Sequence, residues 1–228
     1  MSISLDEAVD LTRTGDVWVF RGRSVPDRAI QFTTNSPVNH VGMAVVLDDM
    51  PPLMWHAELG RSLRDMWTGT PHRGVQLHDL RDAVCVWANR YGQRAWLRQL
   101  EPSAGPTMEQ AVLRTVARLD GTPFPSTAQL AWRWARGRVP QLRLPLPLPL
   151  PGRRDRDDEP AGRADGDRAL ETAYCAEVVA VTYEAMGLLP AGRRPNWYDP
   201  GRFWSGDDLD LAGDARLGAE IEVRIPPR

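Results

Sequence analysis

One strongly apolar segment constrains how this chain can fold more than any other feature. Residues 172–187 begin with Thr172, end with Gly187 and carry apolar or threonine side chains at helical spacing between them. Threonine suits the N-cap of a helix, and glycine suits the position just beyond its C-terminal end. We therefore predict a helix here and expect an α+β fold in which an antiparallel sheet packs against it. The side chains on the predicted face are Val178, Val179, Thr182, Tyr183 and Met186.

A cysteine lies in the first turn of this predicted helix. Unpaired backbone N–H groups and the helix dipole favour an anion there, so Cys175 stands where a thiol ionises most readily to a nucleophilic thiolate. The alternative is that Cys175 is a small buried apolar residue, as many lone cysteines are. The other cysteine, Cys85, lies in the apolar run 83–88, which predicts a buried strand and an inert thiol. Two cysteines do not make a disulfide framework.

A β-hairpin is predicted between residues 39 and 59. Residues 40–47 are apolar or glycine apart from His40, residues 48–52 form a turn, and residues 53–59 return as the antiparallel partner. Because strand side chains alternate faces, His40 should face either His56 or Glu58. The turn type does not fix the register, so both remain open. A polar neighbour of this kind orients an imidazole ring.

Other elements are expected around this hairpin. His72 and His78 have no polar neighbours in the sequence and are interpreted as surface residues. The strand 219–225 alternates polar and apolar side chains, which is typical of a sheet edge. The predicted helices are 4–13, 93–100 and 106–119, and the further predicted strands are 17–20, 75–78 and 83–88.

Residues 139–168 differ in composition from the rest of the chain. Leucine and proline alternate over residues 144–151, which favours polyproline II, and residues 152–167 are charged and rich in glycine. We predict a disordered or surface-looped insertion in one domain made of residues 1–138 and 169–228. The leucine–proline repeat could bind a proline-recognising partner, although a tether without chemistry is the plainer interpretation.

Composition excludes several function classes. The net charge of −2 gives no electrostatic case for nucleic acid. The chain has no lysine, which excludes a Walker-type phosphate loop and a Schiff base. No apolar run reaches the roughly 18 residues of a membrane span, and no signal peptide is recognisable. We expect a cytoplasmic protein without a transmembrane segment.

Three residues could form a cysteine-nucleophile site. A histidine base would take the thiol proton of Cys175, and a third polar residue would hold the base in its productive tautomer. His40 is the candidate base, and His56 or Glu58 is the candidate third residue. This requires the sulfur and the His40 ring to lie on the same side of the sheet. A zinc site from His40, His56 and Cys175 is less favoured, because close-paired ligand spacing is missing.

Four segments occur in a set order along the chain: Gly15-Asp-Val-Trp-Val-Phe20, Asn39-His-Val-Gly-Met43, Trp55-His-Ala57 and Tyr174-Cys-Ala-Glu-Val178. Together they resemble the permuted NlpC/P60 group of papain-like hydrolases, closest to its YiiX/YebB-like branch and more distantly to lecithin–retinol acyltransferase-like enzymes. The resemblance covers roughly residues 15–205, interrupted by the insertion. It implies a circularly permuted papain-like fold, in which the catalytic histidine precedes the cysteine.

The resemblance also implies roles for individual residues. Cys175 would be the nucleophile, its backbone N–H an oxyanion donor, His40 the base and His56 the third polar residue. Tyr174 belongs to the matched motif, and Glu177 would support the local geometry. No cofactor and no resident metal are implied. The expected activity is a cysteine hydrolase acting on an amide or ester bond of a peptide or lipid-like substrate.

Three alternatives remain beside that activity. A lipid acyltransferase would use the same acyl-enzyme with another acceptor. A non-catalytic binding module could retain the same scaffold. An interaction protein acting through residues 144–151 would not need Cys175.

Overall fold

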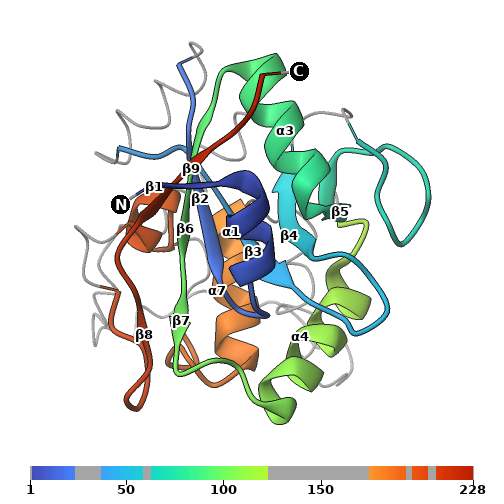
Figure 1. Cartoon of the computed structure of the whole chain (residues 1–228). Coiled ribbons are helices and arrows are strands. Elements are labelled where there is room, and N and C mark those ends of the chain that lie inside the picture. Colours follow the sequence, from blue (N-terminus) through green and yellow to red (C-terminus); the bar gives the residue numbers. More distant parts are fainter. Residues whose placement is uncertain are drawn as a thin grey trace, which may run out of the picture.

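A mixed sheet forms the centre of the molecule (Figure 1). The computed structural model describes residues 2–23, 37–58, 63–122, 175–193, 197–204 and 209–227. The strands are β1 Ser2–Ser4, β2 Val17–Arg21, β3 His40–Val45, β4 Leu53–Glu58, β5 Gly74–Asp79, β6 Arg94–Arg98, β7 Leu100–Glu101, β8 Arg216–Leu217 and β9 Ile221–Arg224. The helices are α1 Leu5–Leu11, α3 Leu80–Tyr91, α4 Pro106–Leu119, α7 Cys175–Ala185 and the 3-10 helix η2 Pro200–Phe203.

The seven strands of the main sheet lie in the order β1-β9-β6-β2-β3-β4-β5, and β7 pairs with β8 in a second, two-stranded sheet. Neighbouring strands run antiparallel except β1 and β9, which run parallel. The α+β prediction is confirmed, but the prediction of a wholly antiparallel sheet is wrong at this edge. The strand predicted at 219–225 is also misplaced, because β9 lies between β1 and β6 and is not an edge strand.

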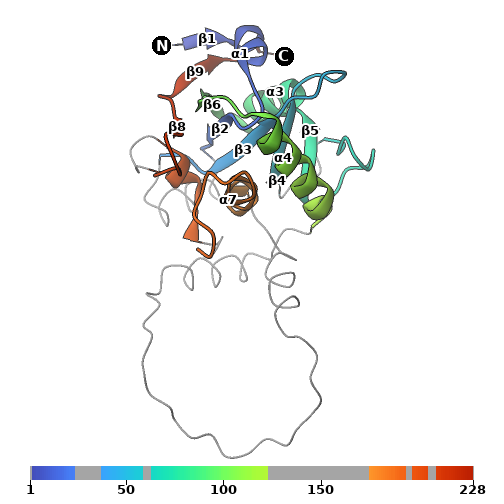
Figure 2. The same ribbon diagram turned by 90° about the horizontal axis from the view of Figure 1, so that it is seen from below.

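Alternation of side chains gives the sheet two apolar faces. Val41, Met43 and Trp55 belong to the core on the side of α7 and α4. Phe20 and Met54 belong to the core on the side of α1 and α3. Figure 2 shows α7 on one side of the sheet and α1 with α3 on the other. The predicted packing of the cysteine helix against the sheet is therefore observed.

Two hydrogen bonds fix α7 against the sheet. Trp55 Nε1 donates to Thr182 Oγ1 at 3.1 Å, and the Tyr183 hydroxyl donates to the Gly15 carbonyl at 2.6 Å. Both bonds are buried and join residues far apart in the sequence, so they specify where the helix lies along the strands. Residues Cys175 to Tyr183 are all buried, which explains why this helix is apolar around its circumference.

The segment predicted as the strand 83–88 belongs instead to the helix α3. The Asp79 side chain accepts from the Asp82 backbone N–H and caps its first turn, and Gly92 ends it in a left-handed conformation. Buried Leu80, Ala83, Val84 and Trp87 recur at helical spacing. The β-branched run around Cys85 favours a strand locally, but the two caps and the buried face outweigh it. Cys85 is buried, as predicted.

The segment predicted as a helix at 93–100 is mostly the strand β6. Ala95 and Leu97 face the α3 side and Trp96 faces the α7 side, as the period of a strand requires. The helix predicted over 106–119 is confirmed at both ends, with proline in its first turn.

Several predictions fall on residues outside the described ranges: the Thr172 N-cap, the insertion 139–168 and the leucine–proline repeat 144–151. In the described part of the chain, no helix combines the length and apolar character needed to cross a bilayer.

Candidate functional site

Three imidazole rings form a chain across β3, β4 and β5. His40 Nε2 lies 3.2 Å from His56 Nδ1, and His56 Nε2 lies 3.0 Å from His78 Nδ1. Strand alternation puts all three side chains on the α3 face, because His56 follows Trp55 and His78 follows Leu77, which face α7. Each contact needs one donor and one acceptor, so the protons of the chain must be ordered in one direction or the other.

The proton order determines what His40 can do. If each ring donates toward His78, His40 carries its proton on Nε2 and its Nδ1 is a free acceptor. If each ring donates toward His40, Nδ1 carries the proton instead. Only the first order leaves His40 able to accept a proton through Nδ1, so His56 and His78 together set its tautomer.

Glu58 and Trp87 complete the cluster. Trp87 Nε1 donates to Glu58 Oε1 at 3.4 Å, and Glu58 Oε2 lies 3.8 Å from His78 Nδ1. The Trp87 ring also contacts the rings of His40 and His56, with centroids 4.9 Å and 4.8 Å apart. Helix α3 therefore closes the cluster from the side opposite α7.

A glycine on β3 leaves room for the Met54 side chain next to His56 on β4. A Cβ atom on Gly42 would lie 2.4 Å from Met54 Sδ and 3.4 Å from His56 Cβ. A side chain at this position would therefore displace the Met54 side chain, whereas its distance to His56 would be an ordinary van der Waals contact.

Burial keeps the imidazoles neutral. His56 and His78 are 0% exposed, while His40 is partly exposed. Burial lowers the pKa of His40 to about 3, with a smaller effect from His78. It lowers the pKa of His78 to about 4, which nearby Asp65 opposes. It also holds the pKa of His56 well below its usual range. His40 is thus the member of the chain that a substrate can approach.

The sulfur of Cys175 lies beside the β3 backbone, one residue from His40. The nearby backbone N–H groups of Val41, Ala176 and Cys175 itself each act to lower the pKa of the thiol. The paired register of β3 and β4 runs from Met43 with Trp55 to Val45 with Leu53, so residues 40–42 lie beyond that ladder. The sulfur therefore reaches the sheet where these two strands are no longer paired.

The thiol and the imidazole approach this point from different sides, so the expectation that both lie on the same side of the sheet is wrong for this structure. Cys175 belongs to the core on the α7 side, whereas the His40 ring contacts Phe20 and Trp87 of the α3 side. Within the described residues, no hydrogen bond joins Cys175 to His40. Burial raises the pKa of the Cys175 thiol to about 12, despite the three N–H groups that favour a thiolate. The resting pair is therefore a neutral thiol and a neutral imidazole.

The sequence correctly predicted that the polar residues of the hairpin lie together, but it missed one histidine of the cluster. His40, His56 and Glu58 come together with His78, which was wrongly interpreted as a surface residue. The signal that could have found His78 is the alternation of Gln76 and His78 with apolar residues along β5. Glu177 is fully buried near Cys175 and raises its pKa. Tyr174 lies outside the described residues.

Comparison with known proteins gives limited support. The sequence matches no family model and no curated protein. Among solved structures, the fold is similar to the metalloprotein YiiX of Escherichia coli O157:H7, with 20% identity, a TM-score of 0.46 and coverage of 80% of this chain and 68% of that one. This is the branch that the sequence motifs resemble, but a likeness at this TM-score carries no functional argument.

Proposed function

We propose that this protein is a cysteine-dependent hydrolase of amide or ester bonds on a permuted papain-like scaffold. The observation that supports this most is the position of the Cys175 sulfur. It lies at the start of α7 beside the β3 backbone at Val41, the residue that follows His40, and His40 Nε2 in turn contacts His56 Nδ1. A helix N-terminus and convergent N–H groups stabilise developing negative charge on sulfur or on a carbonyl oxygen.

The proposed reaction begins with attack of the sulfur on the substrate carbonyl carbon. The thiol proton would pass to His40 Nδ1 as the C–S bond forms, which requires the His40 ring and the sulfur to come together when substrate binds, and the carbonyl oxygen would become an oxyanion stabilised by the Cys175 N–H. The C–N or C–O bond then breaks, and His40 returns the proton to the leaving group. Water, with His40 as base, hydrolyses the acyl-enzyme. Release to another acceptor would make the same site an acyltransferase.

Proton transfer in this scheme accompanies attack. With the thiol pKa raised and the His40 pKa lowered by burial, an ion pair is disfavoured before substrate binds. The bound substrate has to approach His40, the partly exposed ring of the chain. The buried rings of His56 and His78 would act as positioning residues.

The test compares the two cysteines. Both are buried, Cys85 on α3 and Cys175 on α7, so Cys85→Ala is a matched control for Cys175→Ala. On a panel of p-nitrophenyl esters and peptide amides, we expect Cys175→Ala to abolish hydrolysis and Cys85→Ala to retain it. Cys175→Ala with wild-type rates would refute the mechanism, and so would trapping of an acyl group elsewhere by mass spectrometry.

A second candidate, a metal-dependent hydrolase, rests on a different observation. One ligand atom each from His56, Glu58 and His78 lie within 4.8 Å of one another. Two histidines and a glutamate are a donor set that zinc uses in catalytic sites, and two nitrogens on one zinc lie about 3.3 Å apart, close to the 3.0 Å found here. His40 contacts the other nitrogen of His56, as second-shell groups do. The residues therefore fit a zinc ion, which would activate a water molecule when bound.

The same variants separate the two candidates. A metal-dependent enzyme would keep its activity in Cys175→Ala and lose it in Glu58→Gln and after dialysis against a chelator. The cysteine enzyme would lose its activity in Cys175→Ala and keep it after dialysis against a chelator. Elemental analysis of the purified protein reports the metal independently of activity.

A further inference from the structure

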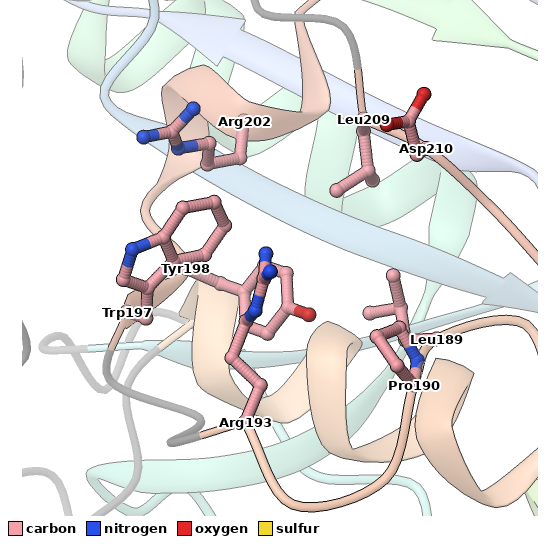
Figure 3. Close-up of a pocket in the computed structure, with 8 residues that line it drawn as sticks. All are labelled: Leu189, Pro190, Arg193, Trp197, Tyr198, Arg202, Leu209 and Asp210. Carbon is pink, nitrogen blue, oxygen red and sulfur yellow. The ribbon is translucent and has the colours of Figure 1, made fainter. Parts of the chain in front are cut away.

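A hollow on the C-terminal side of α7 gathers two arginines around one tryptophan. Its volume is about 190 Å³, and its lining residues are Leu189, Pro190, Arg193, Trp197, Tyr198, Arg202, Leu209 and Asp210. Figure 3 shows Trp197 and Arg202 on one side of the hollow and the leucines and proline on the other, with Arg193 and Tyr198 between them. None of these residues belongs to the histidine cluster or contacts the Cys175 sulfur in the described structure.

The two guanidinium groups are positioned by the same ring. The Arg193 and Arg202 carbons lie 4.3 Å and 4.1 Å from the Trp197 ring centroid. Because both lie so close to one centroid, the two cationic groups are no more than about 8 Å apart. Stacking on an aromatic face orients a guanidinium while its N–H groups remain directed outward.

The charge of the lining favours an anion. It holds two permanently charged guanidinium groups and one carboxylate, that of the exposed Asp210 at the rim. This local excess of positive charge occurs in a chain whose net charge is −2. Burial raises the pKa of the Tyr198 hydroxyl; Arg193 and Arg202 oppose that rise, and Glu184 adds to it. A phenolic O–H adds a neutral donor to the two cationic ones.

The opposite wall is apolar. Leu189 is buried, Leu209 is partly buried, and Pro190 lies between α7 and the arginine-bearing segment. A ligand that filled this hollow would therefore need an anionic group at one end and apolar atoms at the other.

We propose that the hollow binds an oxyanion, a carboxylate or phosphate group, carried on a short apolar chain. The arginines would each donate N–H groups to the oxyanion, a geometry that guanidinium provides better than ammonium. The leucines and proline would cover the chain. This site does not depend on the proposed hydrolase activity.

The test is calorimetric titration of the whole protein with sodium hexanoate, sodium acetate and inorganic phosphate at low salt. We expect saturable binding of hexanoate or phosphate, with hexanoate tighter than acetate because its chain reaches the apolar wall. Arg193→Gln and Arg202→Gln should each weaken binding at least about tenfold. Arg90→Gln is the matched control, because the Arg90 guanidinium also lies over an aromatic ring, that of Tyr91, but outside the hollow.

Binding by Cys175→Ala separates the test of the hollow from the test of the hydrolase proposal. Cys175→Ala should bind hexanoate as the wild type does, whatever happens to its activity. Trp197→Phe should retain the fold, checked by its unfolding temperature, and bind more weakly. No saturation by hexanoate or phosphate below about 10 mM would overturn the proposal. Equal weakening by Arg90→Gln and Arg193→Gln would overturn it too, since binding would then reflect general charge.

Discussion

Replacing His78 by glutamine should make the folded protein less sensitive to acid. His78 is fully buried, its pKa is lowered to about 4, and its neighbours Glu58 and Asp65 do not restore its charge. In the unfolded chain a histidine takes up a proton below about pH 6.5, whereas folded His78 does not until about pH 4. The unfolded state therefore binds more protons between these values, and stability falls as the pH is lowered through that window.

The size of the effect follows from the same linkage. At one pH unit below the unfolded pKa, a histidine that stays neutral in the fold costs about 1.4 kcal/mol. Between about pH 7.5 and pH 5.5, His40, His56 and His78 together should remove about 4 kcal/mol from the free energy of unfolding. His78→Gln should remove one of these contributions, so its loss over that range should be smaller than that of the wild type by about 1.4 kcal/mol.

The assay is denaturant unfolding of metal-free wild type and variant at both pH values. Other titrating groups, such as Asp120 with its pKa raised to about 6 by burial, affect both proteins and cancel in the difference. Gln76→Leu is the control, because Gln76 is equally buried on the same strand and does not titrate. It should lower stability by the same amount at both pH values. An identical acid dependence in wild type and His78→Gln would refute the reasoning.

Three further predictions test the fold and the cluster. Tyr183→Phe removes the buried hydrogen bond to the Gly15 carbonyl and should cost about 1–3 kcal/mol in denaturant unfolding; an unchanged midpoint would show that water replaces the hydroxyl. Gly42→Ala places a Cβ against Met54 and should cost about 1–3 kcal/mol, since the Met54 side chain must shift; wild-type stability would contradict the close contact. Zinc should raise the unfolding temperature of the chelator-treated wild type but not of His78→Gln if the cluster binds metal, and equal shifts in both would place the zinc elsewhere.

The sequence was most informative where patterns were long or geometrically forced. The hairpin alternation correctly brought His40, His56 and Glu58 to one face, and proline and spacing fixed α4 at both ends. The secondary-structure predictions failed where the local propensity of the residues disagrees with the contacts they make in the fold. The β-branched residues around Cys85 favour a strand, yet the capping Asp79 and Gly92 make a helix that supplies Trp87 to the cluster.

The missed parts of the candidate site depend on long-range pairing. The alternation along β5 puts Gln76 and His78 on one face, but His78 is buried because β5 lies beside β4 and is covered by α3, and the alternation does not indicate those neighbours. The position of the Cys175 sulfur also depends on contacts between distant segments. Its helix was foreseen, but the face from which it meets β3 follows from how α7 packs, which a helical period cannot specify.

The place of β9 between β1 and β6 has a consequence for biosynthesis. Ser2 and its neighbours leave the ribosome early, but their only ladder partner in the described structure is the strand 221–224. Until that segment has been translated, β6 also lacks its outer neighbour and exposes an open hydrogen-bonding edge. Nascent chains shortened before residue 221 should therefore depend on chaperones for solubility, whereas those that include it can complete the sheet.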